Sequence, residues 1–296
     1  MNKYLHNCLK MYTSSIDKNL SVSSYKLKEH YATLFLDSLP EDFHSFECLD
    51  KETIYDYLST LNYSEATITA IKFVLKDLFN YLYTNELSSI SGNHLFPIIR
   101  THQRLELLSH YSVDEINSIL DTISSCDKNF RRDRCMLMLA TVLGLRASDI
   151  LSLKLSDIHW EKSVIVKQQI KTKNTVILPM TKKVKLSIID YLKNERPITD
   201  KDLLFVRKNT DGQYSNGIIY GIIQKYLKRT EICINNRKKG PHVLRHSMAT
   251  NLLMQNTPLP VITGILGHKN TNTTRRYLSI DIPKLRDMSL EVDQYE

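Results

Sequence analysis

The stretch DRCMLMLATVLGLRASDI, residues 133–150, decides the fold of the second half of the chain. Its first part, residues 133–145, is apolar on nearly every side of a helix, which is typical of a helix at the centre of a core. The segment GLRASDILSLKLSDI, residues 144–158, follows directly and carries Arg146. The second half is therefore predicted to be built around a central helix, with an arginine just beyond its end.

The first part of the chain also has helical periodicity. Residues 1–90 are typical of amphipathic helices, most clearly in SEATITAIKFVLKDLFNYLYTNEL, residues 64–87, whose start Ser64 or Thr67 can cap. We expect these residues to form a first, helical domain.

A break in periodicity predicts the boundary between two domains. Gly92 and Pro97 interrupt the pattern, and no strong helical face develops before residue 110. Residues 91–110 are therefore predicted to be a linker, and residues 111–296 a second domain.

The second domain is predicted to be mostly helical with one small sheet. Ser112 and Glu115 form a capping-box pattern at its first helix. The β-rich runs SVIVKQQI, residues 163–170, and NTVILPM, residues 174–180, are separated by KTK and predict a hairpin. Helical patterns resume over residues 181–195, 217–232, 242–256 and 258–268.

The charge of the chain is distributed unevenly. Residues 1–130 carry 11 Lys and Arg against 17 Asp and Glu, whereas residues 131–296 carry 29 against 15. A basic second half predicts a polyanionic partner such as DNA, because clustered cations displace counterions from a phosphate backbone.

Composition indicates a globular protein in a reducing compartment. Of the 296 residues, 42% are hydrophobic and 24% charged, which is typical of folded domains. The five cysteines are far apart and form no C-x-x-C pair, so neither a disulfide framework nor a cysteine zinc site is expected. No apolar run has the length of a signal peptide core or a membrane span. We therefore expect a cytoplasmic protein without a membrane partner.

The stretch GPHVLRHSMAT, residues 240–250, raises the question of a metal site. His242 and His246 are four residues apart, as in H-E-x-x-H zinc helices. Val243 stands where such helices carry the glutamate, and no third ligand follows at a suitable spacing. We expect no metal and no cofactor. Taken alone, the segment favours structural roles, with His242 capping the helix and His246 satisfying a polar group in the core.

Taken together, several segments resemble the tyrosine recombinase (phage integrase) family. The matching elements are an arginine after G-L, a lysine on a hairpin, H-x-x-R, a histidine in L-G-H and a tyrosine nine residues later. In this sequence they are Arg146, Lys171, His242 with Arg245, His268, and Tyr277. The complete ordered set is far more specific than any single element.

The resemblance implies a role for each catalytic residue. Tyr277 is the nucleophile that forms a 3′-phosphotyrosine, and Arg146 and Arg245 bind the nonbridging phosphate oxygens, which suits the paired donors of guanidinium. Lys171 protonates the leaving 5′-oxygen, with Lys173 as its rival. The resemblance further implies that His242 exchanges the tyrosine proton, that His268 donates to a phosphate oxygen, and that Asp149 supports the arginine and histidine.

The resemblance also implies an architecture and a partner. The expected fold is a mainly α, two-domain, C-shaped clamp in which a helical core-binding domain and a catalytic domain hold double-stranded DNA. Lys173, Arg237, Lys238 and Lys239 are candidate DNA contacts. The acidic balance of residues 1–130 departs from this pattern, since a DNA clamp is expected to be basic.

The expected activity is site-specific recombination between two DNA sites. Four protomers would exchange strands through a Holliday junction, with DNA-bending accessory proteins as possible partners. A composition rich in Lys, Asn and Ile favours a bacterial mobile genetic element, for integration or transposition. The alternatives are a type IB topoisomerase-like or telomere-resolving enzyme, a recombinase that resolves chromosome dimers, and a DNA-binding protein with an inactive site.

Overall fold

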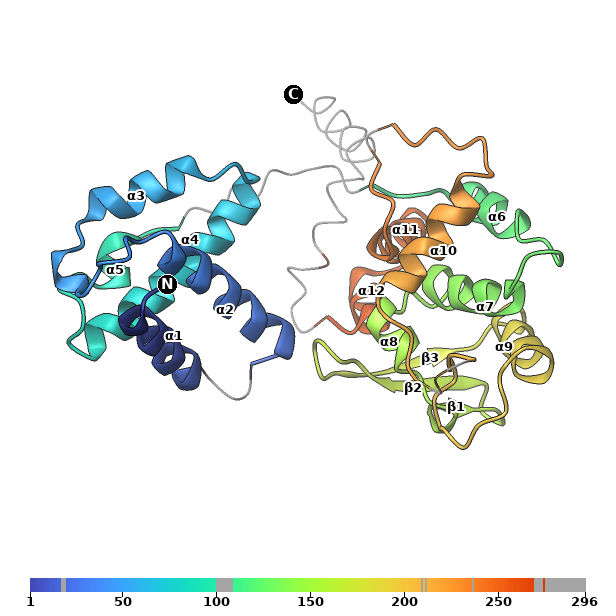
Figure 1. Ribbon diagram of the computed structural model, residues 1–296. Helices are drawn as coiled ribbons and strands as arrows, with labels where there is room; N and C mark the ends of the chain where they lie inside the picture. Colours follow the sequence, from blue (N-terminus) through green and yellow to red (C-terminus); the bar gives the residue numbers. More distant parts are fainter. Residues whose placement is uncertain are drawn as a thin grey trace, which may run out of the picture. The chain divides into compact units, whose positions relative to one another are not determined.

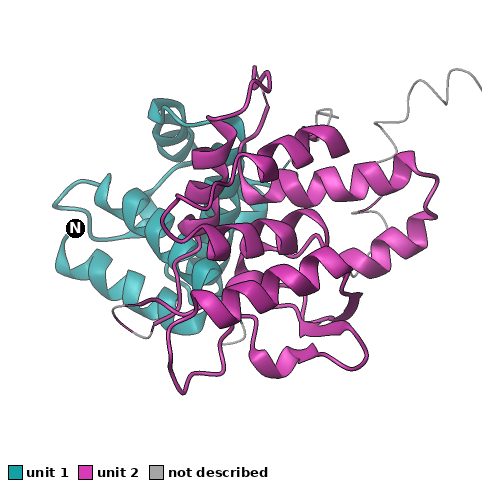
Figure 2. Ribbon diagram, turned by 90° about the vertical axis from the view of Figure 1, so that its right-hand side faces the viewer, with its two compact units in different colours: residues 1–104 teal, residues 105–296 magenta. Residues whose placement is uncertain are grey.

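The computed structural model describes residues 1–16, 20–99, 109–208, 210, 212–235, 237–268 and 274. The chain divides into two compact units, residues 1–104 and 105–296 (Figure 2). Both are mainly helical, and the second also contains a small sheet, so the predicted mainly α class is confirmed. Within the described part of the chain, no helix combines the length and apolarity needed to cross a lipid bilayer.

The first unit is a helical domain whose core surrounds one long helix. Its helices are α1 (Lys3–Ser15), α2 (Val22–Asp37), α3 (Lys51–Thr60), α4 (Glu65–Thr84) and α5 (Gly92–Leu95), with a short 3-10 turn at Phe46–Cys48 (Figure 1). Ser64 caps α4 by accepting a hydrogen bond from the backbone N–H of Thr67. The apolar face of α4 is buried against α1 and α2, as its periodicity predicts.

Helix α5 corrects the predicted start of the linker. Leu95 and Phe96 are buried in the core of the first unit, although residues 91–99 were expected to lie between domains. Gly92 breaks the sequence periodicity for a packing reason: a Cβ atom there would lie 1.8 Å from the carbonyl oxygen of Lys76 on α4. The glycine therefore lets α5 lie directly against α4.

The second unit is built around α7 (Phe130–Thr141), as predicted. Every residue of α7 from Cys135 to Thr141 is buried, and α9, α10 and α11 pack against it (Figure 1). The surrounding helices are α6 (Val113–Asp121), α8 (Ala147–Leu151), α9 (Lys182–Asn194), α10 (Gly217–Leu227), α11 (Pro241–Met254) and α12 (Leu259–Leu266). The capping box of Ser112 and Glu115 is present at the start of α6.

A three-stranded antiparallel sheet completes the second unit. Strands β1 (Ile158–His159), β2 (Val164–Gln168) and β3 (Thr175–Pro179) lie in the order β1-β2-β3, and Ile165 of β2 pairs with Leu178 of β3. The predicted hairpin is thus confirmed. The sequence did not indicate β1, since two residues carry no periodicity.

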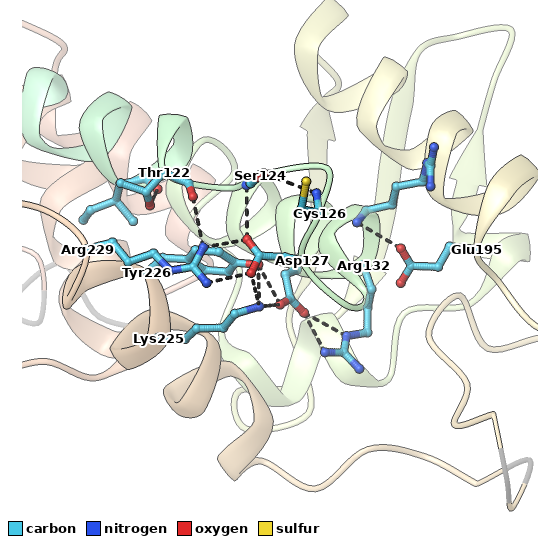
Figure 3. A network of polar contacts seen from close by, with 12 residues as sticks. Thr122, Ser124, Cys126, Asp127, Arg132, Glu195, Lys225, Tyr226 and Arg229 are labelled. Carbon is cyan, nitrogen blue, oxygen red and sulfur yellow. Dashed lines mark hydrogen bonds and ion pairs between the residues drawn. The ribbon is translucent and has the colours of Figure 1, made fainter.

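A network of ion pairs joins α10 to α7 and to the loop before it; we call it the α7–α10 network (Figure 3). Its carboxylates are Asp127 and Asp133, and its donors are Arg132, Lys225, Tyr226 and Arg229. Arg229 binds Asp127 through two hydrogen bonds of 2.6 Å, and Arg132 binds the buried Asp133 at 2.6 Å. The network therefore stabilises the packing of α10 through paired opposite charges.

Candidate active site

Arg146 lies at the turn between α7 and α8. Gly144 makes this turn with a positive φ of 62°, and a Cβ there would lie 2.2 Å from the terminal methyl of Met248. Arg146 follows in an extended conformation as the N-cap residue of α8. Its mostly buried guanidinium donates from Nη1 to Oε1 of Gln169 at 2.6 Å. The turn therefore directs Arg146 toward the β2–β3 hairpin.

Asp149 joins α8 to the same hairpin. Its side chain is fully buried, and Oδ1 accepts the backbone N–H of Ile170 at 2.9 Å. The other oxygen, Oδ2, lies 3.8 Å from Nη1 of Arg146. Asp149 thus holds Ile170 of the hairpin connection in place beside Arg146.

Arg245 connects three segments from inside the protein. It projects from α11 and is only 4% exposed. Nη1 donates to the carbonyl oxygen of Gly144 at 2.5 Å, and Nη2 donates to the carbonyl oxygen of Leu266, the last residue of α12. The final carbonyls of a helix lack partners within the helix, so a buried arginine is a suitable donor for them.

His242 lies in the first turn of α11, among positive charges. Gly240 is the N-cap of this helix and Pro241 its first residue, so His242 does not take the capping position. Partial burial lowers the pKa of His242 below 6.5, and the charges of Lys171, Arg245 and Arg146 lower it further. Lys171 itself is exposed on the β2–β3 connection. Three of the candidate cations thus act electrostatically on the candidate histidine.

His268 follows α12 at a turn that requires glycine. Gly267 has a φ of 62°, and a Cβ there would lie 2.7 Å from both Oε1 of Gln169 and a methyl group of Val176. His268 places Nδ1 2.9 Å from the hydroxyl of Thr274. The predicted nucleophile, Tyr277, lies outside the described residues.

Gln169 contacts the candidate site residues, and the sequence interpretation missed it. Its side chain is 1% exposed and contacts Arg146, the hydroxyl of Thr172 at 2.7 Å and the carbonyl oxygen of Leu266 at 2.9 Å. The alternation of side chains along a strand could have identified it. Every second residue of this run faces the interior, and Ile165, Lys167 and Gln169 are all buried. A polar residue at such a position needs internal partners.

The candidate DNA contacts differ in their surroundings. Lys173 is exposed at the hairpin turn with a φ of 59°, and Lys238 and Lys239 are exposed before α11. Arg237 instead donates to Glu115 of α6 at 2.6 Å and lies over the ring of Tyr111. Arg237 therefore holds the loop against α6, a role that the sequence did not indicate.

In the described ranges, no group of three or more His, Cys, Asp or Glu side chains is arranged to hold a metal ion. His246 is half-buried on the same helix as His242.

Comparison with known proteins gives consistent matches. Residues 110–282 match the sequence model of the phage integrase family. A Sinorhizobium fredii protein named "Putative integrase/recombinase y4gC" is 32% identical over 161 residues, which cover 54% of this chain and 83% of that protein. Tyrosine recombinase XerC of Staphylococcus haemolyticus is 26% identical over 282 residues, 93% of this chain and 92% of its own length.

Solved structures show the same fold. A XerH site-specific recombinase in a post-cleavage complex with its difH substrate matches with a TM-score of 0.75 and 18% identity, over 97% of this chain and 94% of that one. A lambda integrase dimer bound to a core site matches with a TM-score of 0.70 and 18% identity, over 92% and 94%. With the family model matching more than half of the chain, this protein belongs to the phage integrase family of tyrosine recombinases, enzymes that break and rejoin DNA strands.

Proposed function

We propose that this tyrosine recombinase performs site-specific recombination through a covalent 3′-phosphotyrosine on Tyr277. The observation that carries the proposal is that Arg146, Lys171 and Arg245, which come from three separate parts of the second unit, all lower the pKa of His242 through their charges. Three cations and a neutral imidazole suit a site that binds a phosphodiester and moves protons.

Each step of the proposed cleavage has a group suited to it. The phenolic oxygen of Tyr277 attacks the phosphorus and loses its proton to His242, while the bond to the 5′-oxygen breaks. The lowered pKa of His242 keeps its imidazole neutral near pH 7, so that it can accept that proton. Arg146 and Arg245 bind the nonbridging oxygens, on which negative charge develops, and His268 donates a further hydrogen bond.

Lys171 is the proposed acid for the leaving 5′-oxygen. Its charge is among those that lower the pKa of His242, which supports a position near the reacting phosphate. Lys173, the alternative candidate for the acid, lies at the hairpin turn with a φ of 59°. A substrate with sulfur in place of the bridging 5′-oxygen distinguishes the two lysines, because a thiolate leaves without an acid. The cleavage rate of Lys171→Ala should be restored on this substrate. If the rate of Lys173→Ala alone were restored, Lys173 would be the acid instead.

The proposed reaction takes place in a tetramer on two DNA sites, and strands pass through a Holliday junction. In this proposal the first unit, residues 1–104, and the second, residues 105–296, both bind the duplex. We also propose a mobile genetic element as the biological context, in keeping with the name "Putative integrase/recombinase" of the similar Sinorhizobium fredii protein.

Covalent trapping tests the proposal. A footprint on DNA fragments identifies the protected sequence, and a nicked duplex built on that sequence traps the adduct, because the released short strand diffuses away. The wild-type protein should form a covalent complex and Tyr277→Phe should not. Tyr83→Phe, a change at an exposed tyrosine of α4, is the matched control and should react normally. Absence of an adduct with the wild-type protein would reject the proposed chemistry.

A further inference from the structure

We propose that Gln169 is a positioning residue that orients Arg146 for phosphate binding and couples it to the L-G-H segment; this inference rests on the proposed function. Gln169 lies just after β2, where the hairpin connection starts, and accepts a hydrogen bond of 2.6 Å from Arg146. The same amide donates to Leu266, whose carbonyl oxygen also accepts from Arg245. One buried side chain thus connects the two arginines.

The partners of Gln169 fix the orientation of its amide. A guanidinium has donors and no acceptor, so Oε1 must face Arg146. The carbonyl oxygen of Leu266 only accepts, so Nε2 must face α12. The hydroxyl of Thr172 then donates to Oε1 at 2.7 Å. Every polar atom of the amide has a partner, and rotating the amide would break all of these hydrogen bonds.

A neutral acceptor is chemically suited to this position. Oε1 of Gln169 orients the guanidinium of Arg146 without adding a second negative charge to that of Asp149, whose Oδ2 lies 3.8 Å away. A carboxylate at the same place would compete with the phosphate and would also face the carbonyl oxygen of Leu266. Methionine would fill a similar volume without accepting or donating strongly.

The packing of Gly267 extends this coupling toward His268. A Cβ at Gly267 would lie 2.7 Å from Oε1 of Gln169, so the L-G-H turn lies directly against the amide. Asn174, on the other side of the hairpin connection, donates to the carbonyl oxygen of Gly267 at 3.3 Å. The position of Arg146 and the turn before His268 therefore depend on the same side chain.

A double-mutant cycle on the nicked substrate tests the inference. Gln169→Met should lower the rate of adduct formation about 10- to 100-fold, as expected for loss of a hydrogen bond to a charged group. Gln168→Met is the matched control, because this neighbouring glutamine is exposed on the opposite face of the strand, and it should react at the wild-type rate. Melting temperatures of both variants report any loss of folding.

The combined variant gives the decisive comparison. If Gln169 acts through Arg146, adding Gln169→Met to Arg146→Ala should slow the reaction no further. Slow rates stay measurable because the adduct on a nicked substrate accumulates irreversibly. A further slowing by the full factor of the single variant would show an independent, structural role and overturn the inference. Wild-type activity in Gln169→Met would also overturn it, whereas an inactive wild-type protein would reject the proposed function instead.

Discussion

The candidate active site and the α7–α10 network both gather arginines, but the arginines have different partners. In the network, Arg229 and Arg132 bind the carboxylates of Asp127 and Asp133 at 2.6 Å. In the site, Arg245 donates to two backbone carbonyl oxygens, and Arg146 donates to the amide oxygen of Gln169 at 2.6 Å, with the carboxylate of Asp149 farther away at 3.8 Å.

This difference distinguishes arginines that stabilise the fold from arginines whose orientation suits the binding of an anionic ligand. An arginine bound to a carboxylate has its charge compensated within the protein. A guanidinium oriented by a neutral oxygen has a fixed geometry but keeps its charge for an anion. The hydrogen bonds of Arg146 and Arg245 to neutral oxygens therefore agree with a phosphate-binding role, whereas Arg229 is bound to a carboxylate through two hydrogen bonds.

Removing one arginine from each region should separate the two roles most strongly. Arg245→Ala should lower the rate of adduct formation about 100- to 1,000-fold, since a donor to the developing charge is lost. Arg229→Ala should leave this rate unchanged and lower only the melting temperature. Single-turnover adduct formation, measured well below both melting temperatures, checks the comparison. Equal losses of rate in the two variants would contradict the separation of roles.

A buried carboxylate of the network should matter for stability rather than for chemistry. Asp133 is 2% exposed and binds Arg132, Lys225 and the hydroxyl of Tyr226. Asp133→Ala should lower the free energy of unfolding by about 3 kcal/mol, because its cationic partners lose their counter-charge. Urea denaturation measures this change. A stable variant with a strongly reduced adduct rate would instead place Asp133 in the catalytic machinery.

The smallest expected effect is a pH dependence from His242. Its folded-state pKa is lowered below 6.5, so the unfolded chain binds a proton more readily than the folded protein as the pH falls through 6.5. Protonation of His242 therefore favours the unfolded chain. The free energy of unfolding is highest above pH 6.5, where the imidazole is neutral in both states, and it falls as the pH drops below 6.5. The melting temperature of the wild-type protein, relative to His242→Gln, should fall between pH 7.5 and 5.5. A relative increase would mean that the pKa is raised.

Local patterns predicted the elements whose signal lies in consecutive residues. The apolar sequence of α7, the capping box of Ser112 and Glu115, and the runs that form β2 and β3 all needed no tertiary information. Helix α5 was missed because Gly92 was interpreted as a break in helical periodicity. The glycine is instead required by the close contact with Lys76, which lies earlier in the sequence on α4. The linker was therefore predicted to start too early.

The same limit applies to the candidate site. The ordered motifs predicted Arg146, His242 and Arg245 as site residues without a structure. Gln169 was missed because its partners lie 23 and 97 residues away in the sequence, and only folding brings them together. The internal ion pair of Arg237 with Glu115 was missed for the same reason.

The central claim is that Tyr277 is the residue that becomes covalently joined to DNA. The most direct test is mass spectrometry of the trapped adduct after digestion with nuclease and trypsin. We predict that the peptide containing Tyr277 carries the mass of a residual nucleotide linked through a 3′-phosphate, with fragmentation assigning it to that tyrosine. A nucleotide on any other residue, or a linkage through a 5′-phosphate, would contradict the account.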